Sequence, residues 1–376
     1  MDADAPRDPF AHFRAIDDPR GPSRWHRLDE MMVIAILAVL CGASGWTDVQ
    51  QFAQSKLKWL KTFLTLPHGV PSHDTFGRLF AALDPVQLER CFIRWTAAVA
   101  QHSDGVLVAI DGKTIRRSFD HANKKAAIHM VSVFAHANQL TLGQLAVDAK
   151  SNEITALPRL LELLDLKGKT ITVDAMHCQK KTAKAIRDAG ADYLMQVKLN
   201  QKTLHEDIKL FFDEAIDNGW QHTGYAWHET IGKDHGRIET RRCWSTWDID
   251  WLKKRANWPG LKSIACVEAL REVKGKASSE RRYYLSSRDG KDAKAMLAAV
   301  RGHWSIENQL HWCLDVCFGE DDRRLRQGHA AENFSRLGRL VMNLLRQDQS
   351  IKVGLNTKRK RAGWDHDYLL HLISAG

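Results

Sequence analysis

Five short apolar segments between residues 106 and 197 most restrict how this chain can fold. Apolar runs of about four to eight residues are typical of strands. The predicted strands are VLVAID (106–111), 128–136, 140–148, TITVDA (170–175) and DYLMQV (192–197). Two predicted helices, ITALPRLLELL and QKKTAKAIRDAG, precede the last two strands. We therefore expect an α/β core in the order β-β-β-α-β-α-β.

This order predicts a ribonuclease H-like catalytic core, in which three antiparallel strands are followed by α/β crossovers. Before the core, LDEMMVIAILAVL predicts a buried helix. After it, six tryptophans and the alternation in RIETRRCWS favour antiparallel strands. The predicted parts are an irregular arm (1–27), a small all-helical, DNA-binding domain (28–102), the first part of the core (103–199), a β-rich insertion (200–295), helices that complete the core (296–348) and a basic tail (349–376).

Charge and apolar run length limit the partners and the compartment. The formal net charge is +10, which favours a polyanionic partner because basic side chains release counterions from nucleic acid. The longest apolar run, Met31 to Cys41, is too short to cross a bilayer, and the acidic N-terminus does not have the pattern of a signal peptide. Seven cysteines without a CxxC pair fit a reducing cytosol. We expect a cytoplasmic protein with no membrane partner.

Two aspartates end predicted strands of the core. Asp111 ends VLVAID and Asp174 follows TITV. Carboxylates at the carboxyl ends of neighbouring strands converge at the open edge of an α/β sheet. Hard oxygen ligands there suit Mg²⁺ or Mn²⁺, and two such ions can serve phosphoryl transfer. The alternative is that each Asp only caps the turn that follows it.

A third carboxylate ligand would come from later in the chain. Glu307 lies in HWSIENQLHWCLDVCF, a predicted helix with an apolar face, where a carboxylate is costly unless it is paired or bound to metal. The alternative is an exposed Glu on the helix flank. Glu320, Asp321 and Asp322 compete for the role, although their position after Gly319 favours a solvated acidic turn.

Three motifs carry a resemblance to a known family. VLVAIDGKTIRRS, TVDAMHCQ and HWSIENQLHWCLDVCFGEDD resemble the catalytic blocks of DDE-type bacterial insertion-sequence transposases, in the branch that includes the H-repeat-associated proteins. GKDHGRIETRRCW is similar to a segment of that branch's insertion, and the resemblance spans about residues 10 to 348. It implies a ribonuclease H-like fold, a β-rich insertion before the last acid, and Mg²⁺-dependent DNA cleavage and strand transfer.

The resemblance assigns the catalytic and metal-binding roles to Asp111, Asp174 and Glu307. The wider superfamily often has Tyr and Arg before the Glu and Lys after it. Here His303 lies four residues before Glu307 and Leu314 seven after, so those supporting roles do not carry over. His303 could replace the Arg as a phosphate donor or could pack in the core. The residues expected to contact DNA are Lys113, Arg116, Arg117, His177, Lys198, Arg301 and His303.

Three functions remain open at this point. The chain is expected to be a DNA transposase of a mobile element, an endonuclease with two Mg²⁺ or Mn²⁺ ions per site. Its partner would be double-stranded DNA, as element ends and target, with a homodimer formed on DNA and association with the nucleoid. The alternatives are a related metal nuclease that cuts without joining and an inactive relic that only binds DNA. The presence of all three acids argues against the relic.

Overall fold

The computed structural model describes residues 9–22, 24–99, 107–119, 126–147, 153–221, 223–234, 237–273 and 275–374. The chain forms two compact units. The first contains Met1–His102, Gly112–Asn152 and Glu307–Gly376, and the second contains Ser103–Asp111 and Glu153–Ile306. Strand β1 (Leu107–Thr114) passes from the second unit into the first. Val106, residue 148 and parts of the predicted arm lie outside the described residues.

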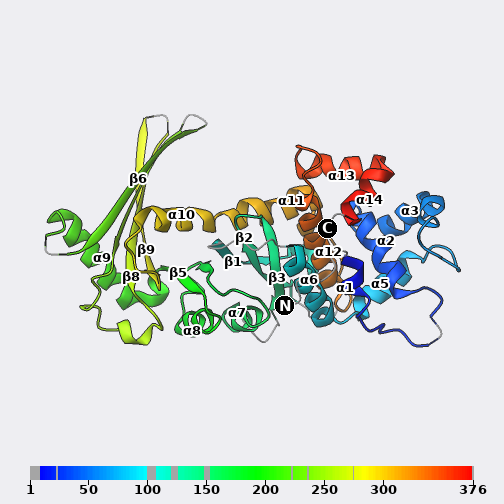
Figure 1. Ribbon diagram of the computed structural model, residues 1–376, viewed down its shortest axis with the longest axis horizontal. Helices are drawn as coiled ribbons and strands as arrows, with labels where there is room; N and C mark the ends of the chain where they lie inside the picture. The colour runs from blue at the N-terminus through cyan, green and yellow to red at the C-terminus, as the bar shows by residue number, and fades with distance from the viewer. Residues whose placement is uncertain are drawn as a thin grey trace. The chain divides into compact units, whose positions relative to one another are not determined.

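The N-terminal segment of the first unit is helical (Figure 1). Ser72 caps the fifth helix, because its hydroxyl accepts a hydrogen bond from the backbone N–H of Thr75 at 3.3 Å. The helical segment from Trp46 to Leu60, which precedes it, is divided at Lys56 into two helices. The helices are α1 (Pro9–Phe13), α2 (Leu28–Leu40), α3 (Trp46–Ser55), α4 (Leu57–Leu60), α5 (His73–Ala82) and α6 (Pro85–Val99).

Helix α12 (Ala330–Gln347) is the centre of the first unit and contacts α2, α5, α6 and β3 (Leu140–Val147). Asn343 pairs with the backbone of Thr141 through bonds of 2.9 and 3.0 Å, which holds β3 against α12. Strand β2 (His129–Ala135) pairs antiparallel with β3, as predicted. The N-terminal helices therefore share a core with these strands and α12.

The C-terminal segment differs from the predicted basic tail. It folds into α13 (Leu355–Trp364) and α14 (His366–Ser374). Lys358 is buried and donates to the carbonyl of Leu345 at 2.8 Å, while Arg359 is buried and donates to the carbonyl of Val39 at 2.8 Å. These two residues do not belong to a solvent-exposed basic run, because both satisfy carbonyl groups inside the unit. Across the part of the chain that the structure describes, no helix combines the length and apolarity needed to cross a membrane.

The second unit contains the parallel part of the sheet, in the predicted order. Strand β1 pairs parallel with β4 (Thr170–Val173), and β4 pairs parallel with β5 (Asp192–Val197). Helices α7 (Glu153–Leu161) and α8 (Lys180–Asp188) provide the crossovers and contact each other. Gly190 has a φ of +71° just after α8, a left-handed conformation that ends the helix and that glycine adopts without strain.

Four long antiparallel strands continue the sheet of the second unit (Figure 1). They are β6 (Tyr225–Asp234), β7 (Arg237–Thr246), β8 (Ser263–Val273) and β9 (Lys276–Ser286). Antiparallel strands are found where the alternation in RIETRRCWS predicted them. Because β9 pairs with β5, these strands extend the core sheet. Sequence patterns missed α9 (Lys202–Asp217), which precedes them.

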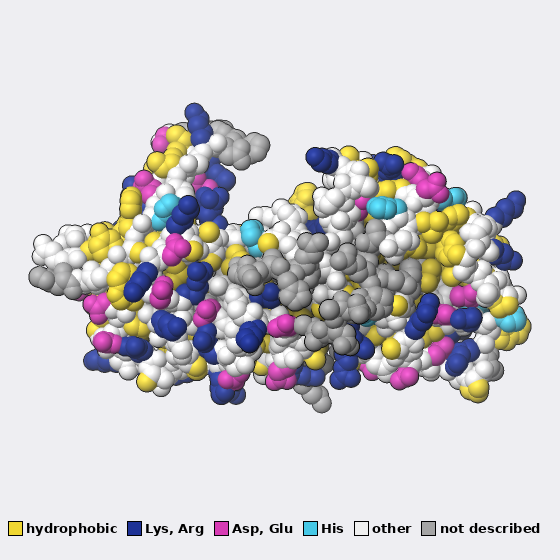
Figure 2. Space-filling view, viewed as in Figure 1, with side chains coloured by type: hydrophobic (Ala, Val, Ile, Leu, Met, Phe, Trp, Pro, Cys, Tyr) yellow, Lys and Arg dark blue, Asp and Glu magenta, His cyan; other side chains and the backbone are white. Residues whose placement is uncertain are grey.

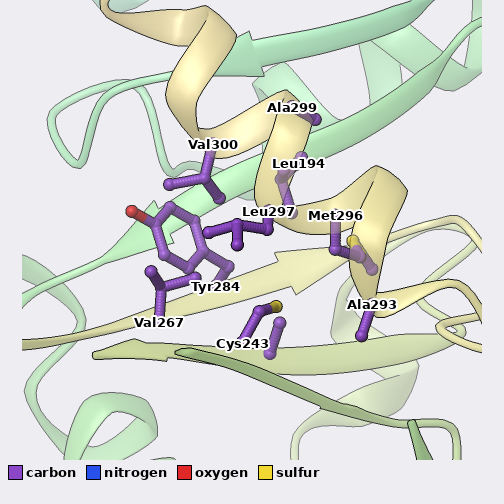
Figure 3. Close-up of a cluster of buried hydrophobic side chains, with 10 residues drawn as sticks. Leu194, Cys243, Val267, Tyr284, Ala293, Met296, Leu297, Ala299 and Val300 are labelled. Atoms are coloured by element: carbon purple, nitrogen blue, oxygen red, sulfur yellow. The ribbon is translucent and has the colours of Figure 1, made fainter. Parts of the chain in front are cut away.

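Helix α10 (Ala293–His303) packs on one face of this extension (Figure 3). Met296, Leu297 and Val300 of α10 contact a buried cluster that includes Cys243 and Tyr284. The predicted single helix over 303–318 is wrong. The chain passes from α10 into a π-helical turn, Ile306–His311, and then into α11 (Trp312–Phe318) and a short turn, Glu320–Asp322. Such π turns are rare and frequently occur at functional sites.

Candidate active site

The two predicted aspartates lie at the same edge of the second unit. In the parallel pair of β1 and β4, Ile110 is in register with Val173, and these are the last paired residues. Asp111 and Asp174 follow them directly, so both carboxylates leave the sheet at its carboxyl edge. Asp111 does not end its strand, contrary to expectation: β1 continues to Thr114. Beyond it, the N–H of Ile115 bonds to the carbonyl of Ile128 at 2.9 Å.

Asp174 begins a tight turn whose backbone is held from two sides. The backbone N–H of His177 donates to Oδ1 of Asp174 at 3.1 Å, so the expected turn-capping role is present. The side-chain amide of Asn200, which follows β5, donates to the carbonyl of Ala175 at 2.6 Å. The His177 side chain is buried. These contacts fix the direction in which Asp174 leaves β4.

Glu307 lies in the π-helical turn, one helical turn before His311. His311 Nδ1 is 3.2 Å from Glu307 Oε2, and the hydrogen bond and charge of His311 lower the pKa of Glu307. Glu307 is exposed, as its alternative interpretation expected, whereas His311 is buried. Asp111, Glu307 and His311 each offer one atom that could bind a metal ion, a carboxylate oxygen or an imidazole nitrogen.

Lys113 is buried, and acidic residues hold it in place. Its Nζ lies 2.8 Å from Asp315 and 3.1 Å from Asp321. Burial alone would lower the pKa of Lys113, yet Asp315, Glu320 and Asp321 raise it overall. Asp321 also pairs with Arg116 at 3.1 Å, so the segment after Asp111 is tied to the turn after α11.

Glu320 is not part of a solvated turn, and that expectation is wrong. Its side chain is fully buried, and its Oε1 accepts from Arg339 Nη1 and from Ser335 Oγ, each at 2.8 Å. Burial raises the pKa of Glu320, but the charges of Arg339 and Arg323 outweigh it and lower the pKa. Asp322 remains exposed, as expected. Glu320 therefore neutralises buried arginines.

The remaining predicted DNA contacts lie in different environments. Arg116 is 81% exposed and Arg117 is 48% exposed and 3.4 Å from Asp322, so both can reach solvent. Lys198, after β5, and Arg301, on α10, are also exposed. His303 Nδ1 lies 3.1 Å from the hydroxyl of Thr172 in β4, as a packing histidine would.

Two family models match this chain. The model for the transposase DDE domain matches residues 102–344, and the model for the segment associated with that domain matches residues 10–96. The chain belongs to the DDE-domain transposase family. Membership in this family implies a divalent metal ion as cofactor and supports DNA as the partner of this transposase.

Relatives from Escherichia coli match nearly the whole length of this transposase. "Putative transposase YncI" of strain O157:H7 is 40% identical over 354 residues, which are 93% of this chain and 90% of that protein. "H repeat-associated putative transposase YhhI" of strain K12 is 38% identical over 372 residues, 96% of this chain and 97% of that protein. The resemblance to the H-repeat branch is confirmed. A solved piggyBac transposase synaptic complex with hairpin DNA covers 98% of this chain and 76% of that one with a TM-score of 0.41 and 10% identity, a likeness too distant to carry any inference.

Sequence reasoning missed several residues that position the acids of this transposase. His311 follows Glu307 by four residues, a spacing that puts both side chains on one helical face and could have indicated the pair. Asn200 gave no such signal, because its partner is a backbone carbonyl 25 residues away. The contacts of Asp315 and Asp321 with Lys113 were equally hidden, since each spans about 200 residues of chain.

Proposed function

We propose that this chain is an active DNA transposase that cleaves the ends of its element and joins them to target DNA, using a ribonuclease H-like core. The adjacency of Asp111 and Asp174 supports this most directly, because each follows a paired residue of two neighbouring parallel strands. Three antiparallel strands followed by α/β crossovers are the expected frame for such a core. The match of the DDE-domain model over residues 102–344 supports the same reaction class.

Asp111, Asp174 and Glu307 are the proposed ligands of two Mg²⁺ or Mn²⁺ ions. Their donor atoms are carboxylate oxygens, which these hard cations prefer. The position of His311 beside Glu307 fits an orienting role better than a ligand role, because imidazole suits softer metals. When bound, a pair of such ions supplies activation of the attacking oxygen and stabilisation of the leaving oxygen.

The remaining contribution of the protein is placement, since phosphoryl transfer needs little covalent chemistry from side chains. The N–H of His177 and the amide of Asn200 hold the turn at Asp174. His311 holds Glu307 in its rotamer. Exposed basic residues of both units, namely Arg116, Arg117, Lys198 and Arg301, would contact DNA phosphates. A homodimer on DNA would bring two element ends together.

The test uses purified protein, DNA carrying its own element ends, and Mg²⁺ or Mn²⁺. Nicked ends together with strand-transfer products are expected. Cleavage without joined products would instead identify the related nuclease, and binding without either product would identify an inactive relic. One relative is named as inactive: "Inactive transposase YbfQ" is 37% identical to this chain, although only over 54 residues. Asp111, Asp174 and Glu307 are all present here, which favours activity.

A further inference from the structure

An unusual charge cluster lies on β7 and β8 of the second unit. Glu239 is nearly buried, with 7% of its side chain exposed, and three arginines surround it. Its carboxylate lies 2.6 Å from Arg241 Nη2, 2.9 Å from Arg271 Nε and 3.7 Å from Arg237 Nη2. Glu239 alone cannot neutralise three guanidinium groups, and Glu280, whose charge also acts on Arg271, already pairs with Arg282 at 2.8 Å, so the cluster carries a surplus of positive charge.

A fourth arginine adds to this surplus. Arg301 of α10 is close enough to Arg241 to lower its pKa, together with Arg271 and Arg237. Burial lowers the pKa of Arg241 first, Glu239 opposes the effect, and the three arginines lower it further. Like charges that lie near one another repel. An anion bound beside these arginines would reduce that repulsion.

The cluster lies on the face of the sheet that α10 covers. Side chains alternate between faces along a strand, so Glu239 and Arg241 share a face with Cys243, which packs under α10 in Figure 3. Arg271 stands opposite Glu239 in the register of β8. Lys and Arg side chains are frequent over β6 to β9 in the view of Figure 2. The arginines remain partly exposed, from 23% for Arg241 to 49% for Arg271.

Helix α10 links this face of the sheet to β4, one of the parallel strands. Arg301 precedes His303 by two residues on the same helix, and His303 contacts Thr172 at 3.1 Å. Thr172 lies two residues before Asp174. The cluster is thus connected through one helix turn to the strand that carries a proposed metal ligand.

We propose that the arginine cluster (Arg237, Arg241, Arg271 and Arg301 around Glu239) binds the phosphate backbone of duplex DNA close to the cleavage site. Guanidinium groups match phosphate oxygens as bidentate donors. Glu239 orients the arginines and leaves a net positive charge for the phosphates. The choice of DNA as the polyanion rests on the proposed function. Contacts of this kind position the duplex without reading its sequence.

The test compares two single variants and one double variant of the cluster with a control variant at the residue next to Arg241 on β7. Arg241→Gln and Arg271→Gln each remove a cluster charge, and the double variant removes both. Arg242→Gln is the control: Arg242 is the next residue of β7, points to the opposite face, and pairs with two carboxylates, Glu229 at 2.7 Å and Glu268 at 3.4 Å. Equal thermal unfolding of the four variants and the unchanged protein shows that each is folded.

Binding is measured on a random-sequence duplex without divalent metal, at several salt concentrations. Each cluster variant is expected to lower the affinity about 10-fold at low salt, because hydrogen bonds to charged groups are lost. Each is also expected to reduce the slope of log K against log salt by about 0.9, as one phosphate contact disappears. Arg242→Gln should change neither quantity.

Unchanged affinity and slope in the double variant would overturn the proposal, and so would an equal loss in the Arg242→Gln control. Failure of the proposed function gives a different result. A protein that binds DNA through the cluster but cleaves no element ends with Mg²⁺ or Mn²⁺ would retain this inference and lose the transposase activity. A protein that binds no duplex at all would lose both.

Discussion

Replacement of Glu320 by Gln should destabilise the first unit strongly, although the side-chain size is kept. Glu320 and Arg339 are both fully buried and lie 2.8 Å apart. The amide retains an acceptor for Ser335 and Arg339, but it leaves the guanidinium charge buried without a counter-charge. Breaking a buried pair in this way costs roughly 3–5 kcal/mol. We expect that loss in the free energy of unfolding, measured by urea denaturation.

Two further variants serve as controls for the unfolding measurement on Glu320→Gln. Asp322→Asn changes a neighbouring carboxylate that is 79% exposed and should leave the unfolding curve in place. Glu320→Gln combined with Arg339→Met removes both charges of the pair and should recover part of the lost stability, because Arg323 stays buried without Glu320. If Glu320→Gln unfolds like the unchanged protein yet fails to cleave DNA, the reasoning is refuted, and Glu320 replaces Glu307 as the third ligand.

Three other outcomes follow from named contacts. Asn343→Ala leaves the backbone groups of Thr141 without their partner and should cost about 1–3 kcal/mol in urea unfolding; a loss below measurement would contradict the docking of β3 on α12. Burial would raise the pKa of Asp348, but hydrogen bonds from Ser350 and Tyr368 and the charge of Lys358 lower it to about 2. The stabilisation by the Asp348 carboxylate is therefore present above about pH 4 and lost as the pH falls toward 2. Asp348→Asn should lower the free energy of unfolding at pH 6 and leave it unchanged near pH 2. An equal effect at both pH values would contradict the lowered pKa of Asp348. Trp227, 51% exposed on β6, is expected to stack on an unpaired base, so Trp227→Ala should slow cleavage without altering unfolding, whereas full cleavage would exclude the contact.

Sequence periodicity predicted the parallel core well, because its strands are short, apolar and separated by helices of ordinary length. The strand at 192–197 begins and ends where DYLMQV predicts it. The paired positions of Asp111 and Asp174 follow from that order, since both aspartates stand one residue beyond the paired apolar segments.

Long-range polar contacts were the main part that the sequence could not predict. Glu320 follows a glycine in an acidic run, which locally indicates a solvated turn, but Arg339 and Ser335 come from a helix that begins ten residues later. Lys358 and Arg359 belong to a run of four basic residues, yet both are buried against carbonyl groups of distant segments. Local composition indicates a solvent-exposed segment in both cases. It contains no information on partners that come from distant parts of the chain.

The tryptophans after residue 200 show the same limit in a different form. Trp220 and Trp244 are each 8% exposed and contribute to the packing of the second unit, whereas Trp227 and Trp247 are 51% and 38% exposed. Aromatic density alone cannot separate core rings from surface rings. The lysines on either side of Leu57 also differ, because Lys56 lies 2.8 Å from His366 while Lys58 and Lys61 are exposed.

Cleavage and binding measured side by side on the three acid variants test the proposed mechanism most directly. Asp111→Asn, Asp174→Asn and Glu307→Gln keep side-chain size and remove only the charge of a proposed metal ligand. Each variant should bind DNA carrying the element ends as the unchanged protein does, and each should lose nearly all Mg²⁺- or Mn²⁺-dependent cleavage. A variant of any of these three residues that folds and cleaves at the normal rate would contradict the assignment of Asp111, Asp174 and Glu307 as the metal-binding acids.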